Sequence, residues 1–151
     1  MALGIKTIQK KYRTLFTPAA VLISSPNKAY AENRLEEKLN FYCVPRLMII
    51  DEIGYVPVDV HGAHLLFQLI SRRYERGSIA LTSNRGFGQW GEIFGDTIIA
   101  TAILDRLLHH STLINVKGES YRLKEKQRAG LIRKHLDVSP VEGRDLAVAL
   151  S

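Results

Sequence analysis

The sequence predicts an α/β fold in which a parallel β-sheet is covered by helices. Residues 47–50 and 79–82 are short, mainly apolar runs of the kind that form strands buried on both faces of a sheet. Between these runs, apolar residues recur at helical spacing from residue 62 to residue 76. Strands that alternate with helices in this way are typical of parallel sheets, because each parallel pair needs a crossover connection.

The N-terminal residues predict a helix, a strand and the start of a second helix. Residues 2–11 have the pattern of an amphipathic helix, and residues 13–16 have the composition of a short strand. Thr17 is expected to cap the next helix, because its hydroxyl precedes a proline, Pro18, at the first helical position.

Prolines are expected to divide the segment that follows. Pro26 should break or kink the helix that begins near Pro18, with Ser25 placed to cap the piece beyond it. Residues 31–42 are charged and helical, and Pro45 should end them before the first buried strand.

The remaining elements complete the α/β pattern. The helix of residues 62–76 ends in cations that suit the helix dipole, and Gly77 is expected to cap it. A further helix is predicted at residues 97–110 and a last strand at residues 113–116. Residues 1–134 are therefore assigned to one domain and residues 135–151 to a C-terminal tail.

Composition indicates a globular domain and argues against several other classes of protein. Of the 151 residues, 46% are hydrophobic, which is enough for a core. No apolar run approaches the length of a membrane span, and the N-terminus lacks the pattern of a secretory signal. The single cysteine, Cys43, cannot form an internal disulfide. These features predict a cytoplasmic protein with no membrane contact.

The charge of the chain favours a polyanionic partner. The formal net charge is +6, and residues 117–134 hold seven basic residues against two acidic ones. This segment is either a solvated basic tail or a nucleic-acid-binding segment. Its basic residues are Lys117, Arg122, Lys124, Lys126, Arg128, Arg133 and Lys134.

Two acidic residues, Asp51 and Glu52, directly follow the first buried strand. In parallel sheets, ligands bind beyond the carboxyl ends of the strands, so polar residues at these positions are candidates for chemistry. Nucleotide hydrolysis needs one carboxylate to hold hydrated magnesium and a second to orient the attacking water. The alternative is that the two acids only begin a loop.

A second polar strand end supports the nucleotide interpretation. Thr82, Ser83 and Asn84 end the next strand, so they should lie beside Asp51 and Glu52 at the same edge of the sheet. A neutral amide there can hydrogen-bond a terminal phosphate and the attacking water without competing for the metal. The alternative is that Asn84 is an ordinary turn residue.

Arg106 lies on an otherwise apolar helix and has two possible uses. It can pair locally, for example with Asp105, or stabilise the charge on a neighbouring molecule's phosphate. From the sequence pattern alone, local pairing is favoured.

Other chemistries have less support in the sequence. The histidines, His61 with His64 and His109 with His110, have no cysteine or carboxylate cluster to complete a zinc site. No G-x-S-x-G stretch supports a serine hydrolase. No stretch of these 151 residues matches G-x-x-x-x-G-K-[ST], the loop whose amides and lysine hold nucleotide phosphates.

Several longer runs of sequence carry a resemblance to a known family. They are IIDEIGYVPVD, LLFQLISRRYERGS, LTSNR, WGEIFGD, ILDRLLHHS and GESYRLKEKQRAGL within residues 47–131, with YRTLFTPAAVLI and NKAYAENRLEEKLNFY upstream. These runs resemble the IstB-like transposition helper ATPases, relatives of the helicase loader DnaC within the AAA+ class. The resemblance implies an AAA+ type P-loop NTPase core.

The resemblance also implies a role for each candidate residue. Asp51 and Glu52 correspond to the Walker B pair, with Asp51 holding Mg²⁺ through water and Glu52 acting on the attacking water. Asn84 corresponds to the sensor-one residue. Arg106 is similar to the arginine finger that completes a neighbouring subunit's site, which reverses the expectation of local pairing. Arg122 is a candidate for a second phosphate-sensing arginine.

Partners and cofactors follow from the same resemblance. It implies ATP and Mg²⁺ as cofactors, and double-stranded DNA and an IstA-like transposase as partners of a homo-oligomer. The candidates for DNA contacts are Lys117, Lys124, Lys126, Arg128, Arg133 and Lys134.

The chain departs from the family at its N-terminus. In the family, a GKT-containing loop and its strand precede the helix that residues 2–11 resemble. We therefore expect a fragment without the phosphate loop, inactive as an ATPase on its own. The alternatives are a non-catalytic DNA-binding or subunit-docking module, or a product with no function of its own.

Overall fold

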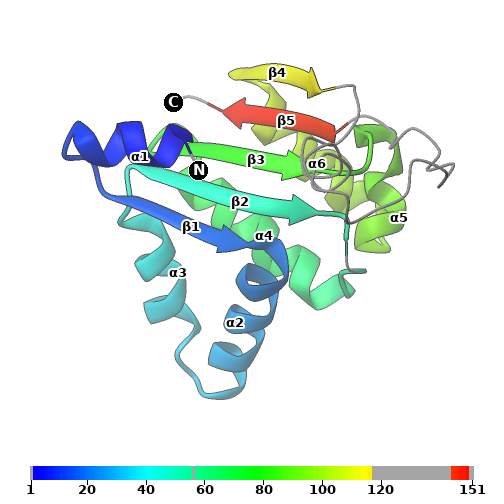
Figure 1. Cartoon of the computed structure of the whole chain (residues 1–151). Helices are drawn as coiled ribbons and strands as arrows, with labels where there is room; N and C mark the ends of the chain where they lie inside the picture. The colour runs from blue at the N-terminus through cyan, green and yellow to red at the C-terminus, as the bar shows by residue number, and fades with distance from the viewer. Residues whose placement is uncertain (1, 56, 117–143, 150–151) are drawn as a thin grey trace, which may run out of the picture.

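A computed structural model describes residues 2–55, 57–116 and 144–149 of the chain (Figure 1). Its strands are β1 (Thr14–Pro18), β2 (Leu47–Ile53), β3 (Ser78–Ser83), β4 (Ser111–Val116) and β5 (Arg144–Ala149). Its helices are α1 (Ala2–Gln9), α2 (Ala19–Ala31), α3 (Leu35–Cys43), α4 (Val60–Arg73), α5 (Trp90–Phe94) and α6 (Thr97–Leu108), with a short 3-10 helix η1 (Phe87–Gln89).

The sheet has the order β1-β2-β3-β5-β4. Strands β1, β2 and β3 run parallel, which confirms the predicted parallel sheet flanked by helices. Strand β5 is antiparallel to both β3 and β4 and lies between them. The prediction that residues 113–116 form the last strand is therefore wrong. Strand β5 begins with two charged residues, Arg144 and Asp145, and the short apolar run that follows them gave no strand signal in the sequence.

The two faces of the sheet are covered differently. Met48 and Ile50 of β2 belong to the main core, which α2, α3, α4, α5 and α6 complete. Leu47, Ile49 and Ala80 form a smaller buried cluster on the other face. There α1 packs so closely that a Cβ on Gly4 would lie 3.2 Å from Cδ1 of Ile49. The alternation follows from the pleat, which sends successive side chains to opposite faces.

The prolines act differently from the prediction. Thr17 and Pro18 belong to β1, the helix begins at Ala19, and the Thr17 hydroxyl donates to Pro18 O at 3.3 Å instead of capping α2. Pro18 fits there because β1 is an edge strand, where a missing N–H is tolerated. Helix α2 also continues through Pro26 to Ala31, so the predicted break is absent.

Two aspartates cap the starts of α4 and α6: the predicted start of α6 at Thr97 is confirmed, whereas α4 begins at Val60 and not at Gly62. Asp59 Oδ1 accepts a hydrogen bond from the Gly62 N–H at 2.8 Å, so α4 begins at Val60. Asp96 Oδ1 accepts from the N–H groups of Ile98 and Ile99 at the start of α6. Both follow the ordinary preference for a short acidic side chain at a helix N-cap.

The end of α4 also differs from the prediction. The helix ends at Arg73 with Tyr74 as its cap, so Gly77 is not the capping residue. Arg73 is not a surface cation near the dipole but is 1% exposed. Its guanidinium donates to the carbonyls of Tyr42, Pro45 and Ser78, each at 2.9 Å.

The helices of the described residues are short relative to a bilayer. None of them combines the length and the apolar character that a membrane span requires.

Candidate functional site

The end of β2 carries a β-bulge at Asp51 and Glu52. Ile50 pairs with Leu81 and Ile53 pairs with Ser83, so both acids lie opposite the single residue Thr82. Glu52 takes a left-handed backbone conformation with φ 65. In a regular strand, two adjacent side chains would point to opposite faces. The bulge instead allows both carboxylates to line the same pocket.

Thr82 holds this bulge in place. Its hydroxyl donates to Asp51 Oδ1 at 2.6 Å and accepts from the backbone N–H of Glu52 at 2.9 Å. One side chain therefore orients the Asp51 carboxylate and satisfies the N–H that the bulge releases from the ladder. The sequence placed Thr82 at this edge but gave it no role. The only signal was a hydroxyl residue at the end of a buried strand.

The structure brings Asn84 close to the loop that follows the two acids. A Cβ on Gly54, which has φ 95, would lie 3.1 Å from Asn84 Oδ1. Asn84 Oδ1 is buried and has no hydrogen-bond partner among the described residues. A buried carbonyl oxygen normally has a partner, so this atom is available to a ligand or a water.

Ser83 joins the two strand ends that carry these residues. It is 1% exposed, and its Oγ lies 3.0 Å from Ile53 O and 2.9 Å from Arg85 O. The Arg85 N–H also donates to this Oγ at 3.1 Å. The polar strand ends expected to share a sheet edge are therefore connected through a buried hydroxyl.

A pocket of about 560 Å³ lies beside the acids. One wall is the start of α2, from Pro18 to Ser24, and the other is the segment from Asp51 to Asp59. The first turn of α2 has no acidic residue and no side-chain cap, so part of its N–H groups remain unpaired by side chains. A pocket with two carboxylates and a helix N-terminus suits a ligand that carries both phosphates and a cation.

Arg106 is held by its own chain on α6 and does not line this pocket. Its guanidinium carbon lies 4.5 Å from the centre of the Phe67 ring on α4, and Nη1 donates to Ala102 O at 3.4 Å. Local contact is therefore present, but with an aromatic ring and not with Asp105.

The remaining candidates lie elsewhere. Arg122 and the basic residues of segment 117–134 fall outside the described residues. The histidines make ordinary contacts: His61 packs edge-on against Tyr30, and His109 shares a hydrogen bond with the Tyr74 hydroxyl. His110 lies 3.9 Å from a Glu75 oxygen.

Comparison with known proteins gives a consistent result. A family model described as "IstB-like ATP binding protein" matches residues 1–129. An insertion sequence IS21 putative ATP-binding protein from Pseudomonas aeruginosa is 56% identical over 135 residues, which cover 89% of this chain and 51% of that protein. The corresponding IS5376 protein from Geobacillus stearothermophilus is 51% identical over 127 residues, covering 84% of this chain and 51% of the relative.

The chain thus spans about half the length of the curated relatives it matches. Among solved structures, AMPPCP-bound DnaA from Aquifex aeolicus is similar with a TM-score of 0.53. The match has 15% sequence identity and covers 83% of this chain and 43% of the DnaA chain. This likeness is one of fold, and it agrees with the expected α/β fold in which a parallel sheet is flanked by helices.

Proposed function

Because this chain belongs to the family of IstB-like ATP-binding proteins, we propose that it binds ATP as a helper protein of insertion-sequence DNA transposition. The pocket at the end of β2 carries this proposal. Asp51 and Glu52 both line it, and Thr82 orients the first of them. The names of the two bacterial relatives support both parts, since each is a putative ATP-binding protein of an insertion sequence.

The two carboxylates would divide the work of hydrolysis. Asp51, fixed by the Thr82 hydroxyl, would hold a hydrated cation near the phosphates. Glu52 is more exposed, and it orients the attacking water and accepts its proton. Asn84 Oδ1, which has no partner among the described residues, would accept a hydrogen bond from that water.

The donor set fits magnesium. Within the described ranges, no group of three His, Cys, Asp or Glu side chains could hold a metal ion by protein ligands alone. Mg²⁺ is usually bound by one or two carboxylates together with substrate phosphates and water, which is what Asp51 and Glu52 offer. When bound, the ion would neutralise charge on the phosphates.

Arg106 is proposed to act in the site of a neighbouring subunit of a homo-oligomer. Its stack on Phe67 keeps the guanidinium ordered while leaving it half-exposed. Arg122 is proposed as a second phosphate-sensing arginine. The proposal includes double-stranded DNA and an IstA-like transposase as partners, with the basic residues of segment 117–134 as candidate DNA contacts.

ATP turnover tests the proposal. The assay uses this chain and a chimera in which the part of the Pseudomonas aeruginosa relative that this chain does not match is joined to it. We expect the chimera to hydrolyse ATP in the presence of Mg²⁺. In the chimera, Glu52→Gln should lower kcat by about 100-fold or more, because the water loses its base. ATP binding should remain.

Glu32→Gln serves as the matched control, since Glu32 is an exposed acid at the end of α2, away from the pocket lining. Its turnover should equal that of the parent chimera. If Glu52→Gln hydrolyses ATP at the parental rate, Glu52 is not the catalytic base.

A second candidate function is a non-catalytic DNA-binding or subunit-docking module, which the net charge of +6 favours. This function predicts DNA affinity of the 151-residue chain that does not depend on ATP and falls steeply with salt. Absence of DNA binding at low salt would exclude it.

A further inference from the structure

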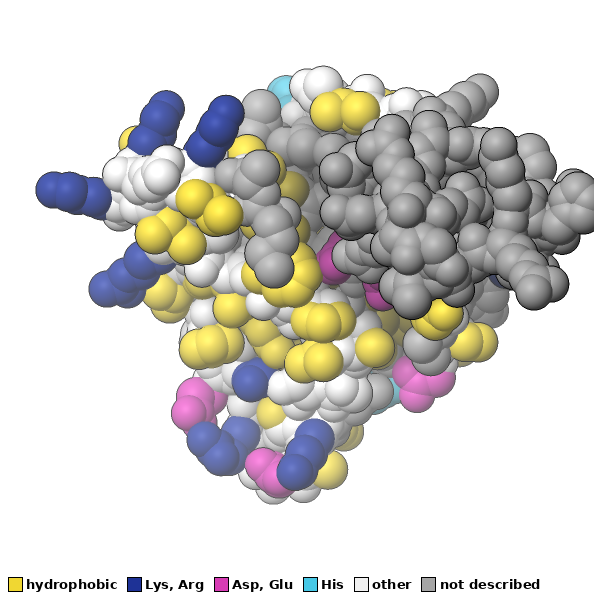
Figure 2. All heavy atoms as spheres, in the orientation of Figure 1, with side chains coloured by type: hydrophobic (Ala, Val, Ile, Leu, Met, Phe, Trp, Pro, Cys, Tyr) yellow, Lys and Arg dark blue, Asp and Glu magenta, His cyan; other side chains and the backbone are white. Residues whose placement is uncertain are grey.

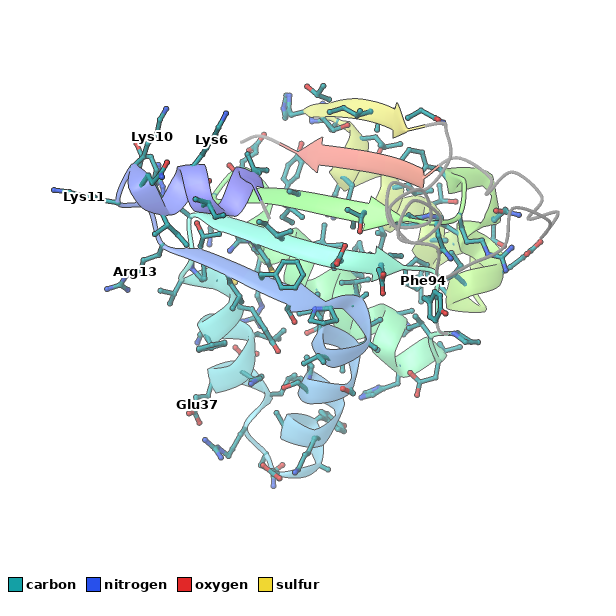
Figure 3. The ribbon with its side chains drawn as sticks, viewed as in Figure 1. Lys6, Lys10, Lys11, Arg13, Glu37 and Phe94 are labelled. Atoms are coloured by element: carbon teal, nitrogen blue, oxygen red, sulfur yellow. The ribbon has the colours of Figure 1, made fainter. Side chains whose placement is uncertain are left out.

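A cluster of basic side chains lies at the edge of the sheet opposite to Asp51 and Glu52. It consists of Lys6, Lys10, Lys11 and Arg13, which come from α1 and the turn into β1 (Figure 3). In the space-filling view, dark-blue side chains gather there with no acidic side chain between them (Figure 2). The printed sequence explains this, because residues 1–31 contain no Asp or Glu.

The four cations of this basic cluster are exposed, and none of them forms an ion pair or a side-chain hydrogen bond with another described residue. A further exposed cation, Arg46, lies just before β2. It is near the cluster because the N–H of the next residue, Leu47, donates to Arg13 O. Among the described residues, no acidic side chain pairs with these like charges to offset their repulsion.

The basic cluster is separate from the candidate nucleotide site. Thr14 pairs with Leu47 at the amino ends of β1 and β2, whereas Pro18 pairs with Asp51 at their carboxyl ends. Four strand steps of about 3.3 Å put roughly 13 Å between the two edges. The basic cluster and the nucleotide pocket therefore lie at opposite ends of the same strands.

Lys11 carries a cost that the fold does not explain. It has φ 63, and it ends α1 in a Schellman motif: the Tyr12 N–H donates to Thr7 O at 3.1 Å, and the Lys11 N–H donates to Ile8 O at 2.8 Å. Glycine is the usual residue at this position, because a side chain in the left-handed region is strained. The helix dipole favours a cation near the end of α1 at all three lysine positions, but it does not require a side chain in the left-handed conformation that Lys11 adopts.

We propose that the basic cluster binds the phosphate backbone of double-stranded DNA. The choice of DNA rests on the proposed function in insertion sequences, and the site itself rests on the charge and geometry of the four side chains. Lysine and arginine side chains that neutralise phosphates release condensed counterions, which gives affinity without sequence preference. On this proposal, a lysine is kept at the strained position because its charge contacts the DNA.

The sharpest test is Lys11→Gly in the 151-residue chain. Glycine relieves the left-handed strain, so the midpoint of thermal unfolding should rise by about 2 °C. Affinity for a fluorescein-labelled DNA duplex, measured by anisotropy, should fall severalfold, with a loss of about 0.9 in the slope of log K against log salt. A fall in stability would instead show that Lys11 is structural and would overturn the inference.

Asn33→Gly is the matched control. Asn33 has φ 55 and ends α2 in the same motif, with the Arg34 N–H on Ala29 O and its own N–H on Tyr30 O. This change alters the same backbone position and removes no charge. DNA affinity should be unchanged. An equal loss of affinity in both variants would contradict a contact through the Lys11 side chain.

A combined variant tests the whole cluster. In this variant, Lys6, Lys10, Lys11 and Arg13 are all replaced by Gln. The magnitude of the slope of log K against log salt should then fall by up to about 3.6, about 0.9 for each phosphate contact. A Gln variant of Lys124, Lys126 and Arg128 forms the comparison arm. If only that second variant loses affinity, or if the chain binds anionic vesicles and not DNA, the inference is wrong. ATP binding is measured in parallel, so failure of the proposed function would be seen separately.

Discussion

Arg73 connects three elements through one guanidinium. It lies at the end of α4 and donates to carbonyls that end α3, precede β2 and begin β3. Burial lowers the pKa of this group from its ordinary value. The three carbonyl acceptors replace the water that burial removes, although Nε has no partner among the described residues.

Replacement of Arg73 by Met should therefore lower the free energy of unfolding by about 3 kcal/mol, because one buried and two partly buried carbonyls lose their donor. Urea denaturation followed by circular dichroism measures the effect. Arg72→Met is the control: Arg72 pairs with the exposed Glu36, so its loss should cost about 1 kcal/mol or less. Equal losses in the two variants would contradict the structural role of Arg73.

Thr82 gives a second prediction at the scale of one residue. Thr82→Val keeps the shape but removes the hydroxyl that orients Asp51 and satisfies the Glu52 N–H. In the chimera, we expect the Mg²⁺ concentration for half-maximal ATP turnover to rise, while Thr82→Ser restores the parental value. Mg²⁺ titration of turnover measures this.

Thr101→Val is the control for Thr82. The Thr101 hydroxyl donates only to Thr97 O within α6, at 2.7 Å. The idea that Thr82 positions the carboxylate fails if Thr82→Val and Thr101→Val have the same Mg²⁺ dependence.

The sequence predicted the place of the candidate site better than its geometry. Asp51, Glu52 and Asn84 could be assigned to one sheet edge because apolar runs end directly before them. The bulge could not be predicted, because it depends on how β2 registers against β3 thirty residues later in the chain. For the same reason, the bond from Thr82 to Asp51 is visible only in the folded chain.

At the scale of elements, helices α3 and α4 are joined by one two-point ion pair. Arg72 donates to both carboxylate oxygens of Glu36, at 2.7 and 2.8 Å. The hydrogen bond from Arg72 lowers the pKa of Glu36 below the usual 4.5. The sequence placed both residues in predicted helices but could not show that the two helices meet.

The Arg72–Glu36 pair should make the stability of the fold depend on pH in the acidic range. Because the pKa of Glu36 is lowered in the folded state, its contribution is fully present above pH 4.5 and is lost as the pH falls through the lowered value. Arg72→Gln should remove that part of the acid dependence. Thermal unfolding at neutral pH and below pH 4.5 measures the difference between the two chains.

The Arg34–Glu37 pair provides an internal reference. Arg34 also lowers the pKa of Glu37, so the acid dependence of the Arg72→Gln chain should be reduced and not abolished. Identical acid profiles of the parent and Arg72→Gln would show that the α3–α4 pair contributes nothing.

Helix boundaries show where element prediction succeeded and failed. The apolar spacing placed α4 and α6 correctly, and α6 begins at Thr97 as predicted, but α4 begins at Val60, directly after its Asp59 cap, and not at Gly62. Pro26 did not end α2, since the buried face of the helix outweighs one lost hydrogen bond. The low helix propensity of proline is a local effect, and at Pro26 the burial of the helix face outweighs it.

At the scale of the whole molecule, β5 connects two parts of the sheet that would otherwise be apart. It pairs with β3 on one side and with β4 on the other. Without it, both neighbours would present unpaired backbone groups.

Removal of residues 144–151 should therefore destabilise the chain strongly, with a broader unfolding transition because β4 no longer shares the ladder. Denaturant unfolding monitored by circular dichroism measures both effects. Removal of residues 150 and 151 alone is the control and should change little. A shortened chain that unfolds as the parent does would show that β5 does not hold the sheet together.

The overall class could be predicted because it depends on the order of apolar runs, and the family relationship agrees with it. The strand order could not, since the partner of β3 comes from a segment far away in the sequence. Neither periodicity nor turn residues carry information on that pairing.

The position of β5 also has a consequence for biosynthesis. Its residues leave the ribosome after every other described residue, yet they belong inside the sheet and not at its margin. The nascent chain can form β1, β2 and β3 early, but it must then keep the open edges of β3 and β4 from pairing with other chains. A protein built in this way is most exposed to aggregation in the interval between the synthesis of β4 and the arrival of β5.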